Sequence, residues 1–104
     1  QQLRQASSDT QRKNEVGMIW GAAQQYRQKT GSYPTAATIN SAAFQSEYGL
    51  NGKPIASTPT RDSYAYSATA ADNSACDNAS KPCAKFKVAV LLSDGTEYSL
   101  TESQ

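Results

Sequence analysis

The chain has no histidine, only two cysteines and no glycine-rich phosphate loop. Without histidine it lacks the Ser-His-Asp and Cys-His sets used in nucleophilic catalysis, and its carboxylates are scattered along the sequence. A zinc site would require more cysteine or histidine ligands than the chain offers. We therefore expect no enzymatic activity, no cofactor, no metal site and no small-molecule substrate.

Charge of one sign and long apolar runs are also scarce. Ten basic and nine acidic residues leave a formal net charge of +1, so no overall field attracts nucleic acid, anionic lipid or acidic substrates. No segment approaches the roughly 18 apolar residues that a membrane-spanning helix needs. A length of 104 residues is enough for one domain with one core.

Residues 8–30 have the pattern of one long helix, and Gly31 can end it in a left-handed conformation. The chain enters this helix almost at once and lacks an initiator Met, which is typical of a processed or shortened protein. Arg12 and Glu15 fall at the same angle as the apolar stripe, so we expect the N-terminal half to project beyond the core. The stripe that should face the core consists of Val16, Ile19, Trp20, Ala23 and Tyr26.

The opposite side of this helix carries mostly small residues, which lie within about 60° of one another on a helical wheel. They are Leu3, Ala6, Thr10, Gly17 and Gly21. A glycine inside a helix costs up to ~1 kcal/mol relative to alanine. A partner helix that approaches closely would explain this cost. Surface positions that tolerate glycine, or a loop of the same chain crossing there, explain the pattern equally well.

The middle of the chain predicts one short extra helix at residues 38–47, closed by Gly49, and an irregular connection at residues 51–62. Residues 63–70 alternate as a strand, with Tyr64 and Tyr66 on one face. The segment KFKVAVLLSDGTEYSL predicts a hairpin with a two-residue turn at Asp94-Gly95. That turn would pair Leu91 with Tyr98 and Ala89 with Leu100.

These elements predict one α+β domain spanning residues 1–104, with a long N-terminal helix packed on a small antiparallel sheet of three to four strands. We divide it into the helix (1–31), a connection from helix to sheet (32–62) and the sheet region with a cysteine loop (63–104). Cys76 and Cys83 enclose a polar loop and are expected to form a disulfide, with two free thiols as the alternative.

Three further groups in the C-terminal half admit a functional and a structural interpretation. The basic residues Lys81, Lys85 and Lys87 could contact a polyanion such as nucleic acid, but a solvated sheet edge is favoured. Asp72 and Asp77 could serve as an acid-base or calcium pair, although acidic loop residues are usually only solvated. The triplet that begins at Asn78 fits an N-glycosylation site.

The segment QQYRQKTGSYPT at residues 24–35 resembles the helix end of type IV pilins and pseudopilins. In that family, a helix ending in a Tyr-containing turn is followed by Gly-x-Tyr-Pro, which Tyr26, Gly31, Tyr33 and Pro34 match. The resemblance implies a pilin-like fold and a cysteine loop similar to the disulfide-bounded loop of pilins. The family's cleavage site, its glutamate and its apolar helix half have no counterpart in this sequence.

The resemblance implies a structural subunit of an extracellular type IV pilus or related filament at the cell surface, assembled with other pilin subunits through the N-terminal helix. The precursor would be anchored in the bacterial inner or cytoplasmic membrane by an apolar segment that is missing here. The alternatives are a minor pilin that acts as an adhesin or DNA-binding subunit, and a type II secretion pseudopilin. Motility, adhesion, DNA uptake and secretion remain open as roles.

Overall fold

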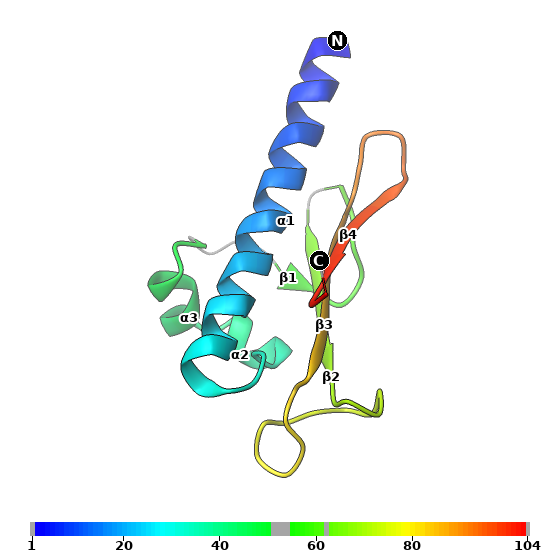
Figure 1. Cartoon of the computed structure of the whole chain (residues 1–104). Helices are drawn as coiled ribbons and strands as arrows, with labels where there is room; N and C mark the ends of the chain where they lie inside the picture. Colours follow the sequence, from blue (N-terminus) through cyan, green and yellow to red (C-terminus); the bar gives the residue numbers. More distant parts are fainter. Residues whose placement is uncertain (1, 51–54, 62, 104) are drawn as a thin grey trace.

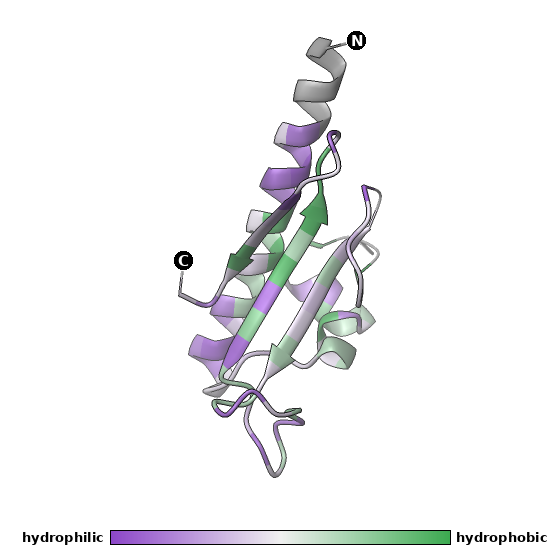
Figure 2. Cartoon of the chain, turned by 90° about the vertical axis from the view of Figure 1, so that its right-hand side faces the viewer, coloured by the Kyte–Doolittle hydropathy of each residue, from purple (hydrophilic) through white to green (hydrophobic). Residues whose placement is uncertain are grey.

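In a computed structural model, a long helix and two short helices cover one face of a four-stranded sheet, and the other face points away from them (Figure 1, Figure 2). The structure describes residues 2–50, 55–61 and 63–103, and only the backbone of residues 2–8. The predicted α+β class is therefore confirmed. The elements are α1 (Gln2–Thr30), α2 (Ala36–Ile39), α3 (Ala42–Glu47), β1 (Ile55–Ala56), β2 (Tyr64–Thr69), β3 (Lys85–Leu91) and β4 (Glu97–Thr101).

The sheet is mixed and not purely antiparallel, which corrects the prediction. Its order is β1-β2-β3-β4, and β1 runs parallel to β2, with Ile55 opposite Tyr64. The other two pairs are antiparallel. Strand β1 lies in the segment expected to be irregular, because two residues between prolines are too few to show an alternating pattern.

The β3–β4 hairpin differs from the predicted register by one residue. Its turn has three residues because Gly95 adopts a φ of +87° after a tight turn, in which its N–H donates to the Leu92 carbonyl at 2.9 Å. Tyr98 and Leu100 consequently face the core together with the buried valines of β3. The observed pairs are Leu91 with Glu97, Val90 with Tyr98, Ala89 with Ser99 and Val88 with Leu100.

Two short helices replace the single one predicted. Ser41 interrupts the helical run, because its hydroxyl donates to the Thr38 carbonyl at 2.7 Å and accepts from the Phe44 N–H at 3.2 Å. This arrangement makes Ser41 the N-cap of α3. Gly49 follows α3 with a φ of +70°, as expected of a residue that ends a helix.

The core lies between α1, the short helices and the inner face of the sheet. Val16, Ile19 and Ala23 of the expected stripe are buried, and Trp20 and Tyr26 pack against the core while partly exposed. The remaining core consists mainly of Tyr33, Ile39, Phe44, Leu50, Tyr64, Tyr66, Phe86, Val88 and Val90.

Candidate assembly surface

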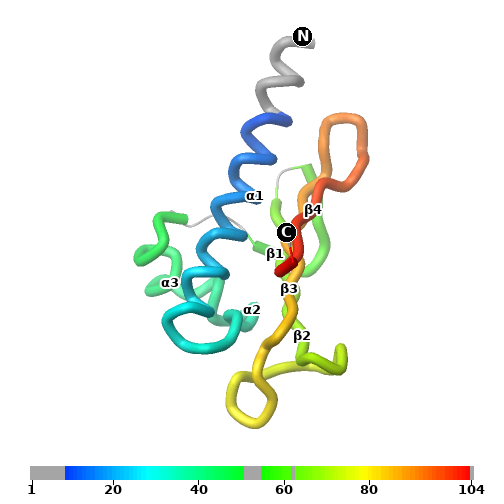
Figure 3. Tube along the Cα trace, in the orientation of Figure 1, coloured from blue at the N-terminus to red at the C-terminus, as the bar shows by residue number. Residues whose placement is uncertain are grey.

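The small-residue side of α1 points away from the sheet. A Cβ atom added at Gly17 or Gly21 would meet no described atom within 4 Å outside the local helix, so both positions border open space. Thr10 is exposed on the same side. Met18, beside Gly17, is the one exposed large apolar side chain among the described residues, at 45%. The structure does not describe the side chains of Leu3 and Ala6, which belong to the segment drawn in grey at the start of the trace (Figure 3).

A strip of α1 about 100° wide, which we call the neutral face, carries no charged residue in the described part of the helix. Exposed helix faces of globular proteins usually carry charges, whereas the centres of protein interfaces are depleted of them. The sequence prediction covered only the small residues of this side, although the lack of charge is visible in the sequence too. The neutral face consists of Thr10, Asn14, Gly17, Met18, Gly21, Gln25 and Gln28.

Residues 9–15 of α1 lie outside the buried core, as we expected from Arg12 and Glu15, but polar contacts attach them to the sheet side of the domain. Asp9 accepts hydrogen bonds from the Ser93 N–H, the Ser93 hydroxyl and Arg12, each at 2.9 Å. Arg12 also donates to the Arg61 carbonyl at 2.8 Å. Burial opposes ionisation of Asp9, but these hydrogen bonds outweigh it and hold the Asp9 pKa below its usual value.

Glu15 makes the next contact along the helix, since it accepts a hydrogen bond from the Tyr64 hydroxyl. Burial and then this bond to Glu15 raise the Tyr64 pKa well above its ordinary value, so the hydroxyl stays protonated and remains a donor. Further along the helix, Trp20 donates from Nε1 to the Thr101 carbonyl at 2.8 Å. Together these bonds fix the rotation of α1 about its own axis and keep the neutral face outward.

The sequence motif at the end of α1 forms a rigid exit. Gly31 has a φ of +97°, and its N–H donates to the Arg27 carbonyl at 2.7 Å, which closes the helix as predicted. Tyr33 then donates from its N–H to the Cys83 carbonyl at 2.9 Å. Pro34 is fully buried, and its carbonyl accepts from the Tyr66 hydroxyl at 2.6 Å. The motif thus ties the helix end to both the sheet and the cysteine loop.

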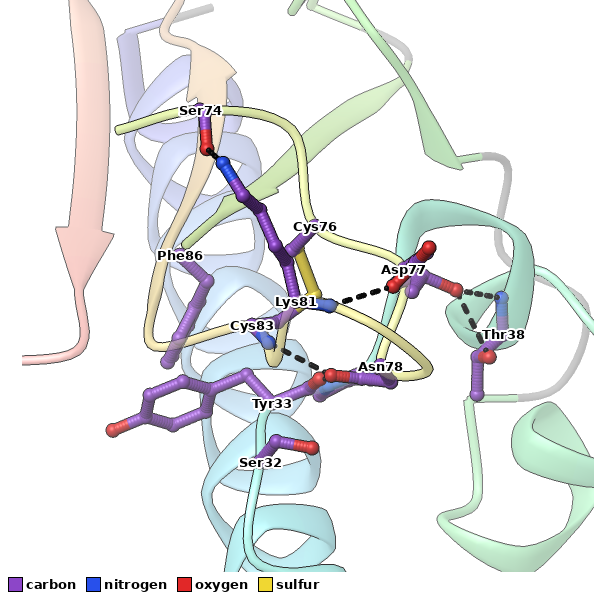
Figure 4. The surroundings of a disulfide bond; sticks show 12 residues. Ser32, Tyr33, Thr38, Ser74, Cys76, Asp77, Asn78, Lys81, Cys83 and Phe86 are labelled. Atoms are coloured by element: carbon purple, nitrogen blue, oxygen red, sulfur yellow. Dashed lines mark hydrogen bonds between the residues drawn. A yellow bond between two sulfur atoms is a disulfide. The ribbon is translucent and has the colours of Figure 1, made fainter. Parts of the chain in front are cut away.

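Cys76 and Cys83 form the predicted disulfide, and its loop is pinned to the helix exit (Figure 4). Asn78 donates to the Tyr33 carbonyl at 2.8 Å and accepts from the Cys83 N–H at 2.7 Å. Both ends of this amide therefore take part in hydrogen bonds, which hold the cysteine loop against the helix exit. Asp77 accepts from the N–H groups of residues 79–81, and these bonds, led by that of Lys81, lower its pKa to about 2.

Each of the three lysines of the predicted basic group contacts an acidic or an amide side chain. The Lys81 ammonium nitrogen lies 3.4 Å from a carboxylate oxygen of Asp72 and donates to the Ser74 hydroxyl at 2.7 Å. The Lys87 ammonium forms an ion pair with the Glu97 carboxylate, with a nitrogen–oxygen distance of 2.7 Å. Lys85 donates to the Asn73 side chain at 3.0 Å. Within the described ranges, no group of three or more His, Cys, Asp or Glu residues is placed to hold a metal ion, and no helix is both long and apolar enough to cross a membrane.

Comparisons with protein-family models, with curated proteins and with solved structures gave no match to this chain. The assignment of a role to the neutral face therefore depends on its geometry and on the motif at the helix end.

Proposed function

We propose that the protein is a structural subunit of a type IV pilus or a related filament, and that the neutral face of α1 packs against helices of neighbouring subunits. The observation that carries the proposal is the open space at Gly17 and Gly21 within an exposed strip that has no charge. Glycines at i and i+4 let two helix backbones approach closely, and the surrounding amide groups can hydrogen-bond across the contact. The resemblance of residues 24–35 to the pilin helix end supports the same role.

The rest of the domain fits the demands of such a contact. A helix used for assembly must keep its rotation and its position relative to the domain, so that every subunit presents the same face. Asp9 and Trp20 hold the rotation, and the exit at Tyr33 and Pro34 holds the far end. The disulfide loop lies at that end of the molecule, away from the start of α1 (Figure 1).

The test compares folding with assembly. Gly17→Leu and Gly21→Leu should leave residues 1–104 folded, because no described atom occupies the space, but should prevent incorporation of the full-length chain into filaments. Gln11→Leu adds the same side chain at an exposed position outside the neutral face, and should assemble normally. Filaments sheared from cells are quantified by immunoblotting and electron microscopy. Normal assembly of both glycine variants would refute the proposal.

The sequence encoded immediately before Gln1 offers an independent test. About 20 apolar residues, preceded by a short basic leader, support the filament subunit, since that segment would supply the anchor and the apolar half of the helix. A cleavable secretory signal in that place would argue against it.

The DNA-binding alternative receives less support, because Lys81 and Lys87 have acidic neighbours and Lys85 is hydrogen-bonded to Asn73. A salt-dependent affinity for DNA that disappears when all three lysines are changed to glutamine would favour a minor-pilin role.

A further inference from the structure

The described part of α1 is attached to the domain by two different kinds of contact. From Val16 onward, apolar residues enter the core, and Val16, Ile19 and Ala23 are fully buried. No side chain of residues 9–15 is buried to this degree. These seven residues, which we call the latch segment, contact the sheet side through the polar groups of Asp9, Arg12 and Glu15. The Lys13 ammonium also lies over the ring of Tyr98, 5.4 Å from its centre.

Asp9 and Arg12 contact residues in turns and connections, whereas Glu15 accepts from the hydroxyl of Tyr64, a buried residue of β2. Ser93 belongs to the β3–β4 turn, and Arg61 belongs to the segment between β1 and β2. Arg61 joins these two segments by donating from Nε to the carbonyls of Leu92 and Ser93, at 3.2 Å each. Release of the latch segment would exchange hydrogen bonds between protein groups for hydrogen bonds to water, and it would uncover no fully buried apolar residue of α1.

Gly17 marks the boundary between the two parts of the helix. It follows Val16, the first buried residue in the described part, and it is the weakest helix former between residues 9 and 20. Once detached, residues 9–15 keep none of these tertiary contacts, and most of the stability of helices in proteins comes from tertiary packing. The latch segment would therefore lose its helical hydrogen bonds when it opens.

We infer that α1 contains a built-in hinge at Gly17, across which the latch segment opens locally while residues 18–30 stay packed on the sheet. Such an opening lets the domain turn relative to the start of its long helix while Val16, Ile19 and Ala23 stay buried, and it breaks the hydrogen bond between Tyr64 and Glu15. The inference rests on the contacts of the isolated chain and does not depend on the filament proposal.

Amide hydrogen exchange of residues 1–104, followed by NMR, tests the hinge. Amides of residues 12–16 should exchange at least about tenfold faster than those of residues 20–26, with a step at Gly17. The double variant Asp9→Asn with Arg12→Gln should speed exchange of the first group by about tenfold, because it weakens charge-assisted hydrogen bonds. Exchange of the second group should change by less than about twofold.

Two further variants test the role of Gly17 and provide a control at the other end of α1. Gly17→Ala should slow exchange of residues 12–16 by about fivefold, since alanine favours the helix by roughly 1 kcal/mol. Lys29→Gln breaks an exposed ion pair with Glu47 at the other end of α1 and should leave that group unchanged. If the exchange rates instead fall smoothly from the start of the helix and do not change in the double variant, the helix end only frays. That result would overturn the inference. Equal acceleration of both groups would overturn it too, because α1 would then open as one unit.

Discussion

Replacing the two helical glycines by alanine should stabilise the isolated domain, although the proposed function requires glycine there. Gly17 and Gly21 have no positive φ, and a Cβ atom at either position meets no described atom within 4 Å. The substitution therefore brings no steric cost and removes the excess backbone entropy of glycine in the unfolded chain.

The size of the effect follows from helix propensity. Alanine is favoured over glycine inside a helix by about 0.8–1.0 kcal/mol, so the double variant should gain about 2 kcal/mol. Unfolding entropies near 2.1 cal/mol/K per residue give about 0.22 kcal/mol/K for 104 residues. The expected rise in Tm is therefore about 9 °C.

Urea and thermal unfolding, monitored by circular dichroism and by the fluorescence of Trp20, measure the change. Gly31→Ala is the matched control, because it is the same chemical change at a φ of +97° and should destabilise by about 1 kcal/mol. If the double variant at Gly17 and Gly21 is no more stable than the parent, these glycines are not free surface positions in the monomer. Their lower helix propensity could then no longer be explained by a need for glycine in assembly.

Three other predictions follow from single contacts. Tyr66→Phe should destabilise by about 1–3 kcal/mol in urea unfolding, because it leaves the buried carbonyl of Pro34 without its donor, and an unchanged midpoint would contradict the observed bond. Trp20→Phe should cost about 1 kcal/mol by losing the bond to Thr101, and a variant as stable as the parent would rule that bond out as a contributor. The Asp77 pKa of about 2 lies below its ordinary 3.8, so its stabilisation is complete above pH 3.8 and is lost as the pH falls through 2. Asp77→Asn should therefore lose less stability than the parent between pH 4.5 and 2, and parallel profiles would refute this reasoning.

Local sequence patterns predicted the parts of the fold that depend on local interactions. The burial of Val16, Ile19 and Ala23 follows from their helical spacing, and the end of α1 follows from Gly31. The alternation in β2 likewise placed Tyr64 and Tyr66 on one face, and both are buried. In each case the residue's neighbours along the chain determine the outcome.

Errors arose where distant residues decide the structure. The hairpin turn includes Ser93, which bonds to Asp9 of α1, and Gly95 accommodates a third turn residue, so the Asp-Gly pair alone could not give the register. The attachment of Arg12 could not be predicted, because its partners, the Arg61 carbonyl and Ser93, are 49 and 81 residues away. Helical periodicity predicts on which side of the helix a residue lies. It does not predict whether a polar side chain on that side has a hydrogen-bond partner.

The structure argues against one of the three explanations that the sequence left open for the small residues of α1. A loop of the same chain crossing Gly17 and Gly21 would place atoms near their Cα positions, and none of the described residues does so. Two explanations remain: tolerated glycines, or a partner outside the chain. If Gly17 and Gly21 are merely tolerated surface residues, the glycines are explained. The five other residues of the neutral face are exposed and all uncharged, and this explanation gives no reason for it. A solvated helix face gains solubility from charges, whereas a face that becomes buried against another helix would have to desolvate them, at a cost of several kcal/mol per ion. The absence of charge therefore favours a partner over tolerance.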